Sequence, residues 1–401
     1  MILPRDNYLN KLKALKDMPV IKVITGIRRC GKSVLLDLFK EYLIDSGVPE
    51  DRIISMTFSH GSEEEITAAD VLEEVRGKMI KGKKNYVFLD EVQMVKGWEK
   101  AVLTLFEEGS SDVYITGSNS QMFSSKLSTL LSGRETEVEM FPFSYREFLS
   151  FTEQNDSADA LSEYMRIGGF PLAVALRDRP EYAMTVLDDI YGTIVLRDIV
   201  ERNNIRNPQM LNRISMFLMR NIGNPVSVKS IMDYMVSAGF KINFETVDSY
   251  LGMLEEAFIF YRLKRYDTKA KEELVVNDKF YIADIGLRNA ELGFRNADIG
   301  QFMENLVYFE LRRRGYSVFV GKFNSLEIDF VAMNTERVMY YQVSYSIEDP
   351  GTRERELEPL KRLRDGHRKT VITMIPSLNK DHDGIREIGL REFLTDDGFD
   401  R

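Results

Sequence analysis

The stretch that most constrains the fold is the octapeptide GIRRCGKS, residues 26–33, which lies between two apolar segments of different period. The preceding run VIKVIT (20–25) predicts a buried strand, and the following run KSVLLDLFKEYLID (32–45) has apolar residues at helical spacing. The octapeptide matches the pattern G-x-x-x-x-G-K-[ST] in full. Because a strand precedes it and a helix follows it, we expect a phosphate-binding loop rather than a turn that matches by chance.

All eight residues of this loop are expected to surround the phosphates of a nucleotide: Gly26, Ile27, Arg28, Arg29, Cys30, Gly31, Lys32 and Ser33. In such loops the lysine reaches the β- and γ-phosphates, and the hydroxyl that follows it ligates magnesium. The sequence therefore predicts ATP and Mg²⁺ as ligands, with Lys32 on the phosphates and Ser33 on the metal.

A second motif, YVFLDEV (86–92), ends an apolar strand with two adjacent acids, Asp90 and Glu91. Carboxylates at such a place are costly unless the end of the strand opens onto a polar site. We expect Asp90 to hold Mg²⁺ and Glu91 to orient the water that attacks the γ-phosphate. Two solvated acids at a strand end are the alternative.

Two further stretches suggest residues that complete the site. ITGSNS (115–120) ends another strand with Thr116, Ser118 and Asn119, one of which would sense the γ-phosphate or the attacking water. We favour Asn119, and an ordinary polar turn is the alternative. Arg134 precedes the fifth strand, where oligomeric ATPases place an arginine that reaches a neighbour's site. It predicts a homo-oligomer if it acts in trans, and otherwise it is a surface arginine.

The pattern of apolar runs predicts an α/β protein with a P-loop NTPase core. Residues 1–150 alternate strand-like and helical runs, which is typical of a mostly parallel sheet covered on both faces. The rest of the chain predicts a helical lid or linker at 151–205, a winged helix-turn-helix at 206–285 and a nuclease-like α/β domain at 286–401.

Composition narrows the class of protein. A single cysteine excludes an intrachain disulfide and fits a reducing compartment. The formal charge of −9 argues against a surface devoted to nucleic acid, although a local basic face stays open. No run approaches the roughly 18 apolar residues that span a bilayer. We expect a cytoplasmic protein with no membrane partner.

The winged-helix segment leaves DNA binding open. Its second helix, from about residue 244, carries acids that would repel phosphates: Glu245, Asp248, Glu255 and Glu256. The strand that follows, YRLKRYDTKAK (261–271), is basic and would suit a wing along a DNA backbone. Double-stranded DNA is therefore a candidate partner of this segment or of the last domain, and a packing lid or protein contact is the alternative.

The last domain resembles the PD-(D/E)xK nuclease fold in its order of helix, three strands, helix and strand. That chemistry needs an acid on the helix, an aspartate on the second strand and E-x-K on the third. Glu304 and Asp329 fit the first two positions, but Gln342 replaces the third acid and Ser344 replaces the lysine. Since an amide binds a divalent cation weakly and serine carries no charge, we predict a degenerate, inactive site.

Several stretches together resemble the AAA+ ATPases of bacteria and archaea that carry a C-terminal domain of unknown function: VIKVITGIRRCGKSVLL, FLDEVQ, ITGSNS, LSGRETEVEMFPFSYREF and IGGFPLAV. The later stretches YGTIVLRDIV and KFYIADIGLRNA resemble the same group, so the resemblance covers nearly the whole chain. It implies an ATP-binding AAA+ core, a helical lid with a winged-helix region and a nuclease-like terminus.

The leading hypothesis is a Mg²⁺-dependent ATPase whose hydrolysis moves the winged-helix and nuclease-like output region. The alternative is a nucleotide-gated DNA-binding or adaptor protein with little turnover. A weaker alternative is an active Mg²⁺-dependent DNA nuclease.

Overall fold

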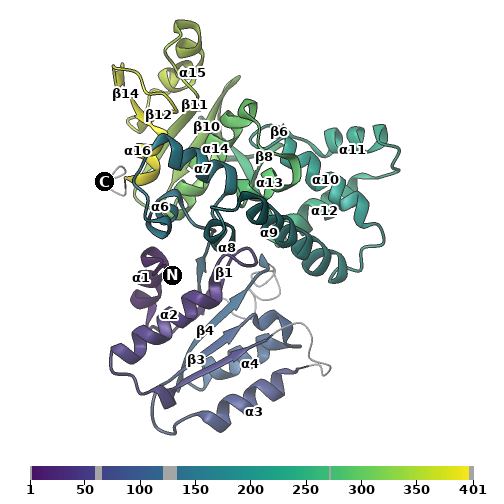
Figure 1. The fold of residues 1–401 in the computed structure, drawn as a ribbon, viewed down its shortest axis with the longest axis vertical. Coiled ribbons are helices and arrows are strands. Elements are labelled where there is room, and N and C mark those ends of the chain that lie inside the picture. Colours follow the sequence, from purple (N-terminus) through teal and green to yellow (C-terminus); the bar gives the residue numbers. More distant parts are fainter. Residues whose placement is uncertain (1, 59–65, 121–132, 271, 397–401) are drawn as a thin grey trace. The chain divides into compact units, whose positions relative to one another are not determined.

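The computed structural model describes residues 2–58, 66–120, 133–270 and 272–396 (Figure 1). The chain forms two compact units, one of residues 1–142 with 256–258 and one of residues 143–255 with 259–401. The predicted phosphate loop lies in the first unit, and the predicted nuclease-like residues lie in the second.

The first unit is built on a sheet of five parallel strands in the order β2-β3-β4-β1-β5. The strands are β1 (Ile21–Thr25), β2 (Ile53–Thr57), β3 (Asn85–Asp90), β4 (Ser111–Gly117) and β5 (Glu135–Glu139). The predicted parallel core is therefore confirmed. Because β4 lies between β1 and β3, the loops that leave these three strands emerge side by side at one edge of the sheet.

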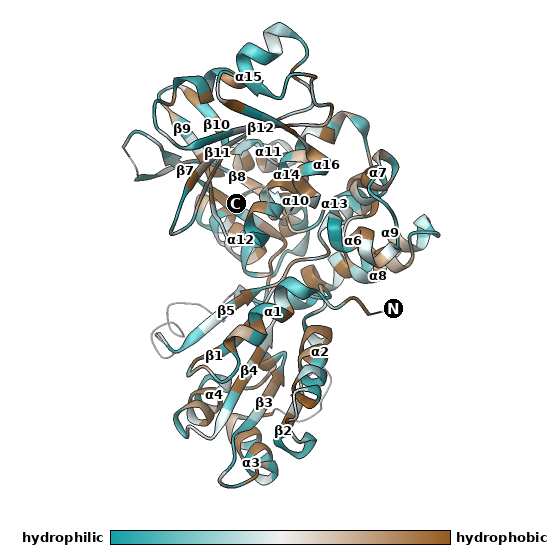
Figure 2. Ribbon diagram, turned by 90° about the vertical axis from the view of Figure 1, so that its left-hand side faces the viewer, coloured by the Kyte–Doolittle hydropathy of each residue, from teal (hydrophilic) through white to brown (hydrophobic). Residues whose placement is uncertain are grey.

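Helices cover both faces of this sheet: α1 (Asp6–Leu15), α2 (Lys32–Asp45), α3 (Ala68–Lys78) and α4 (Trp98–Glu107), with the 3₁₀ turns η1 (Glu50–Arg52) and η2 (Val92–Met94). Alternate residues of β3 point to opposite faces. Val87 and Leu89 join the core with α3 and α4, whereas Phe88 packs against Tyr114 and against Phe39 of α2. Figure 2 shows the hydrophobic residues along α2 where it lies beside the sheet.

The second unit contains, in its described residues, a mixed sheet in the order β13-β14-β12-β11-β10-β9-β7-β8-β6. Its strands are β6 (Pro225–Val226), β7 (Phe260–Asp267), β8 (Glu272–Ile282), β9 (Ser317–Phe323), β10 (Leu326–Met333), β11 (Val338–Ser344), β12 (Arg368–Thr373), β13 (Asp381–His382) and β14 (Ile385–Gly389). Its helices are α6 (Tyr145–Thr152), α7 (Ala158–Ile167), α8 (Pro171–Ala175), α9 (Pro180–Thr193), the π-helical η4 (Ile194–Glu201), α10 (Pro208–Arg220), α11 (Val228–Ser237), α12 (Phe244–Glu256), α13 (Ile285–Leu292), the 3₁₀ turn η5 (Asn296–Asp298), α14 (Ile299–Arg313), α15 (Pro350–Arg362) and α16 (Leu390–Thr395).

The hairpin β7–β8 belongs to this main sheet. β7 pairs antiparallel with β8 and parallel with β9, with Tyr266 opposite Gly321. The basic strand that the sequence suggested as a wing is therefore joined by hydrogen bonds to the strands of the nuclease-like segment. One sheet runs across residue 285, where the sequence suggested a boundary between two domains.

A buried carboxylate joins two of the glycine motifs of the second unit. Asp284 accepts hydrogen bonds from the backbone of Gly169 at 2.6 Å and of Gly286 at 2.8 Å. A Cβ at Gly168 would lie 1.8 Å from Asp284 Oδ1, so this close approach requires glycine. Burial raises the pKa of Asp284 to about 7. The stretches IGGF and ADIG are thus a packing motif around one acid.

Candidate functional site

The phosphate loop joins the end of β1 to the start of α2. Gly26 has a φ of +136° and Gly31 a φ of +109°, and Gly31 is the N-terminal capping residue of α2. A Cβ at Gly26 would lie 2.0 Å from the carbonyl oxygen of Met140, so no other residue fits there. Strand, loop and helix follow one another as the sequence indicated.

Lys32 turns its side chain back into the loop. Its ammonium donates to the carbonyl oxygens of Gly26 at 3.0 Å and Ile27 at 3.2 Å, and it lies 3.7 Å from Oε1 of Glu91. The lysine side chain is only 3 % exposed. Ser33, in the first turn of α2, is exposed, so its hydroxyl is accessible at the N-terminus of the helix.

The remaining loop residues divide into buried and outward-facing ones. Ile27 and Cys30 are buried, and the Cys30 thiol lies 3.5 Å from the carbonyl oxygen of Met140. Burial raises the pKa of this thiol, which makes it a packing group rather than a reactive one. Arg28 is half-buried and Arg29 is exposed.

The two acids at the end of β3 are held by the neighbouring strand β4. Thr116 donates its hydroxyl hydrogen to Asp90 Oδ1 and accepts the backbone N–H of Glu91 at 2.8 Å. Asp90 is 6 % exposed. One threonine on β4 thus fixes both the first carboxylate and the backbone of the second.

Glu91 has a φ of +55°, a left-handed conformation that costs a non-glycine residue roughly 1–2 kcal/mol. Such strain is typical of functional positions. Burial raises the pKa of its carboxyl group, but the charges of Lys32 and Arg28 and hydrogen bonds from Gln93 and Ser118 outweigh that effect. The pKa of Glu91 therefore lies below its usual range, and the side chain is an anion at neutral pH.

Of the three candidate sensor residues, two contact the acids directly. Thr116 contacts Asp90, and the Ser118 hydroxyl donates to Glu91 Oε2 at 3.0 Å. Asn119 follows at the next position and is buried. The sequence did not single out Gln93, whose amide nitrogen donates to Glu91 Oε2 and lies 3.3 Å from the Ser118 hydroxyl. Its only sequence signal is its place two residues after the acid.

Arg5 is a second residue that the sequence did not reveal. Its guanidinium donates to the carbonyl oxygen of Cys30 at 3.0 Å and to that of Phe141 at 2.8 Å. The residue is 4 % exposed and lies over the ring of Tyr8, 4.8 Å from its centre. A charged side chain from the N-terminal segment therefore fastens the phosphate loop to the chain that follows β5.

Arg134 lies at the other end of the sheet from the phosphate loop. β1 and β5 are parallel, with Ile21 opposite Glu135 and Thr25 opposite Glu139, and the loop follows Thr25. The Arg134 side chain is 45 % exposed and pairs with Glu107 at 2.7 Å. Four residues of strand separate the two ends by ~13 Å, so Arg134 does not face the phosphate loop of its own chain.

The structure brings three of the four nuclease-like residues together in the second unit. Lys279 Nζ lies 3.5 Å from Glu304 and 3.6 Å from Asp329. The backbone N–H of Asp329 donates to Gln342 Oε1 at 3.3 Å. Ser344 instead donates to the carbonyl oxygen of Ser346 at 3.2 Å. Nothing in the sequence indicates that Lys279, which lies on β8, contacts these acids.

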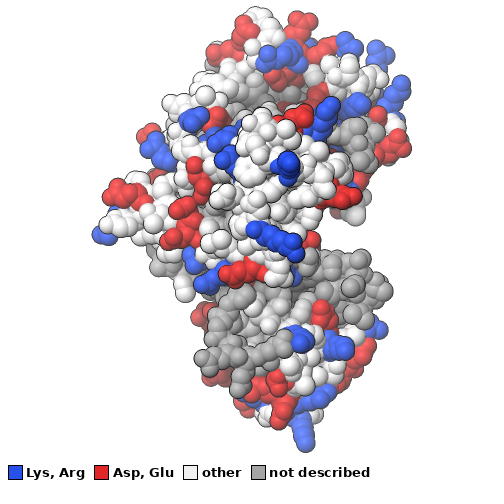
Figure 3. Space-filling model, turned by 90° about the vertical axis from the view of Figure 1, so that its right-hand side faces the viewer, with Lys and Arg blue, Asp and Glu red and all other residues white. Residues whose placement is uncertain are grey.

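Three basic residues of β7 are paired with acids. Arg262 lies 2.8 Å from Glu255 of α12, and Lys264 lies 3.0 Å from Glu273. Arg265 contacts Glu327 of β10 at 2.7 Å. On the face drawn in Figure 3, Lys and Arg are interspersed with Asp and Glu. The charge of this hairpin is therefore largely compensated within the chain.

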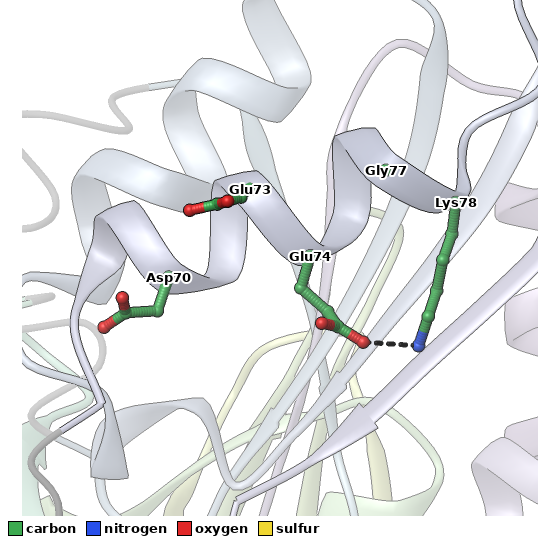
Figure 4. A pocket seen from close by; sticks show the side chains of 5 residues that line it. All are labelled: Asp70, Glu73, Glu74, Gly77 and Lys78. Atoms are coloured by element: carbon green, nitrogen blue, oxygen red, sulfur yellow. Dashed lines mark ion pairs between the residues drawn. The ribbon is translucent and has the colours of Figure 1, made fainter.

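One surface hollow lies on α3, away from the residues above (Figure 4). It is lined by Asp70, Glu73, Glu74, Gly77 and Lys78, and the lysine pairs with Glu74 at 2.6 Å. Three carboxylates around one paired lysine repel a phosphate. None of the helices in the described ranges is long and apolar enough to cross a membrane.

Comparison with known proteins shows the family of the chain. Residues 19–149 match a family described as an AAA domain, and residues 158–298 match a domain of unknown function, DUF8612. An uncharacterized protein of Haemophilus influenzae is 37% identical over 399 residues, which is 98% of this chain and 98% of the relative. The chain belongs to this AAA-domain family.

A second member, the uncharacterized protein MJ1544 of Methanocaldococcus jannaschii, is 30% identical over 360 residues, 84% of this chain and 77% of the relative. Among solved structures, the Walker-type ATPase PABY2304 of Pyrococcus abyssi has a TM-score of 0.52 at 16% identity. The match covers 72% of this chain and 95% of that chain. At this identity the likeness concerns the fold alone, and the five-stranded parallel core is that of a P-loop ATPase.

Proposed function

We propose that the AAA domain of this chain binds ATP with Mg²⁺ and hydrolyses it. The observation that carries the proposal is the arrangement at the carboxyl edge of the sheet. Lys32 at the end of the phosphate loop and Glu91 at the end of β3 lie 3.7 Å apart, and Thr116 of the intervening strand holds Asp90 beside them. A phosphate-binding lysine and an anionic base thus converge on one place.

The donor set fits a magnesium ion. The Ser33 hydroxyl and the Asp90 carboxylate are hard oxygen ligands of the kind that Mg²⁺ prefers together with substrate phosphates. When bound, the ion supplies positive charge that neutralises the phosphate oxygens. The backbone N–H groups of the loop and the ammonium of Lys32 add to that charge from the protein side.

Glu91 has the properties of the base in hydrolysis. Its lowered pKa keeps it anionic at neutral pH, so it is able to orient a water molecule and accept its proton. Ser118 and Gln93 hold one of its oxygens and fix the side chain. On these contacts we assign the sensor role to Thr116 and Ser118 rather than to Asn119, which the sequence favours.

Arg134 is proposed to act on a neighbouring copy. Its place at the opposite end of β5 excludes its own phosphate loop, so any role in transition-state stabilisation requires a second chain. A homo-oligomer is therefore part of the proposal.

Two substitutions test binding and hydrolysis separately. Lys32→Ala should abolish ATP binding, whereas Glu91→Gln should keep binding and stop phosphate release. Lys40→Ala is the matched control, because Lys40 lies on the same helix and pairs with Asp37 at 2.7 Å. Binding is measured by calorimetry with Mg·ATP and turnover by phosphate release. Wild-type turnover in Glu91→Gln would refute the catalytic assignment.

The second unit is proposed to be the output region that hydrolysis moves. Its helix–helix–hairpin order at α11, α12 and β7–β8 supports a winged-helix origin, and α14 with β9–β12 supports a nuclease-like one. Nucleotide-gated DNA binding is the alternative function. The ion pairs of Arg262, Lys264 and Arg265 weigh against the hairpin as the DNA contact, because paired cations release few counterions.

A further inference from the structure

Three elements of the second unit meet at one buried lysine. Lys279 is on β8, Glu304 is on α14, and Glu327 and Asp329 are on β10. We call these four residues the Lys279 cluster. The two acids that the sequence assigned to a nuclease-type metal site, Glu304 and Asp329, are both members.

The lysine lies between the carboxylates. Its Nζ is 3.0 Å from Glu327 Oε1, 3.5 Å from Glu304 Oε2 and 3.6 Å from Asp329 Oδ1. Only 4 % of its side chain is exposed. A buried ammonium is stable only if its hydrogen-bonding capacity and its charge are both satisfied, and three carboxylates around it do both.

Each carboxylate also has a second partner in the protein besides Lys279. Tyr281 donates its hydroxyl hydrogen to Glu304 Oε2 at 3.1 Å, and Arg265 contacts Glu327 Oε2 at 2.7 Å. The backbone N–H of Val343 donates to Asp329 Oδ2 at 2.9 Å. The orientation of each acid is thus fixed by the protein.

We propose that Lys279 is the resident cation of this cluster and takes the place that a divalent metal ion would occupy in a nuclease-type site. A Mg²⁺ or Mn²⁺ ion needs oxygen ligands at about 2.0–2.2 Å, and it cannot share that space with an ammonium that contacts the same carboxylates. In the described part of the chain, no three His, Cys, Asp or Glu side chains are grouped so as to hold a metal.

Gln342 fits this interpretation better than an acid would. Its Oε1 accepts the N–H of Asp329, and its Nε2 donates to Glu356 at 3.1 Å. A carboxylate at this position would add a negative charge that suits a divalent cation. The amide leaves a cluster in which three carboxylates face the single charges of Lys279 and Arg265. A glutamine on the third strand and a lysine from β8 therefore both reduce the excess negative charge of the cluster.

With the ammonium in place, the three carboxylates are not grouped so as to hold a metal. Removing the ammonium while keeping the three acids should let them close around a divalent cation. In the wild-type chain, the second unit then works without metal chemistry, and the cluster ties β8 to α14 and β10.

The test is a Mn²⁺ titration of the full chain without nucleotide. The electron paramagnetic resonance signal of free Mn²⁺ measures how much of the ion stays unbound. Lys279→Met keeps the length of the side chain and removes its charge, and it should gain one Mn²⁺ relative to the wild type. The gain should disappear in the double variant Lys279→Met/Asp329→Asn. Lys264→Met is the control, because Lys264 is 60 % exposed on the neighbouring strand β7. Any weak Mn²⁺ site near the phosphate loop is present in wild type and in all three variants, so it does not affect the difference in bound Mn²⁺ between them.

Two results would overturn the proposal. One is Mn²⁺ bound by the wild-type chain and lost in Asp329→Asn, which would make the cluster a metal site already. The other is a folded Lys279→Met that gains no Mn²⁺. If Lys279→Met folds only when Mn²⁺ is present, that rescue supports the proposal. If it folds under neither condition, Lys279→Gln, which keeps the three acids and still offers them a hydrogen-bond donor, is titrated instead, and its failure to gain Mn²⁺ overturns the idea.

Discussion

Replacing Arg5 by alanine should loosen the phosphate loop from outside the motif itself. The guanidinium donates to the carbonyl oxygens of Cys30, within the loop, and Phe141, beyond β5. Without it, two buried backbone acceptors lose a charged donor, and the loop loses its connection to the chain after the last strand of the sheet.

The size of the effect follows from these two contacts. Hydrogen bonds that involve a charged group contribute about 1.5–3 kcal/mol each, and water entering the space left by the side chain recovers part of that. We expect Arg5→Ala to destabilise the first unit by about 2–4 kcal/mol. Only the hydrogen bond to Cys30 lies in the loop, so only its loss should weaken nucleotide binding. If that loss costs about 1.4 kcal/mol of binding free energy, nucleotide affinity falls tenfold.

The assay compares nucleotide titrations and thermal unfolding of wild type, Arg5→Ala and Arg5→Lys. Lysine keeps the charge but cannot reach both carbonyls in the planar geometry of a guanidinium, so it should fall between the other two. Lys13→Ala is the matched control, since Lys13 is a cation of α1, the helix that Arg5 precedes, and lies over the ring of Tyr42 at 4.6 Å. Equal affinity and equal melting temperature in Arg5→Ala and Lys13→Ala would refute the reasoning.

Three further predictions address the loop, the buried acid and the assembly. Gly26→Ala places a methyl group against a carbonyl oxygen and should remove nucleotide binding in a titration, while a variant that still binds like wild type would contradict the tight approach. Burial raises the pKa of Asp284 from 3.8 to about 7, so its stabilising contribution is full below pH 3.8 and declines as the pH rises through 7. The free energy of unfolding, measured in urea at pH 5 and pH 8, should fall with pH in wild type and fall less in Asp284→Asn. An equal fall in both proteins would contradict this prediction. Finally, Arg134→Ala and Glu91→Gln chains should each be inactive alone, and an equal mixture should regain activity at about a quarter of the sites if the arginine acts between copies; an Arg134→Ala chain that keeps wild-type turnover by itself argues for a surface role.

The sequence predicted the core well because its signals are local. A glycine-rich turn between a buried strand and an amphipathic helix specifies its own backbone, so Gly26, Gly31 and Lys32 lie where the motif indicated. The α/β class followed from alternating runs, and the parallel sheet confirms it. The catalytic roles of Glu91 and Asp90 stay predictions.

Contacts between distant segments were beyond the sequence. Arg5 is an isolated arginine near the start of the chain, and nothing in its neighbours indicates that it ends against the loop. Thr116 was one of three polar candidates, and only the order β3-β4-β1 shows that β4 lies between the loop and the acids. The sheet also settles the position of Arg134. Because β5 is parallel to β1 and Arg134 directly precedes β5, this residue lies at the end of the sheet opposite the phosphate loop.

The segment that the sequence compares with a nuclease shows how a contact from a distant strand adds to what one strand indicates. Glutamine and serine in place of E-x-K on the third strand predict a degenerate, inactive site, and this stays a prediction. The structure has a buried ammonium among the acids, supplied by β8, which joins the same sheet through β7 and β9. Because acids buried without a cation would be strongly unfavourable, the ammonium of Lys279 accounts for how Glu304 and Asp329 are accommodated in the interior. A cluster of buried acids therefore need not indicate a bound metal, provided that a positive charge from elsewhere in the chain compensates it.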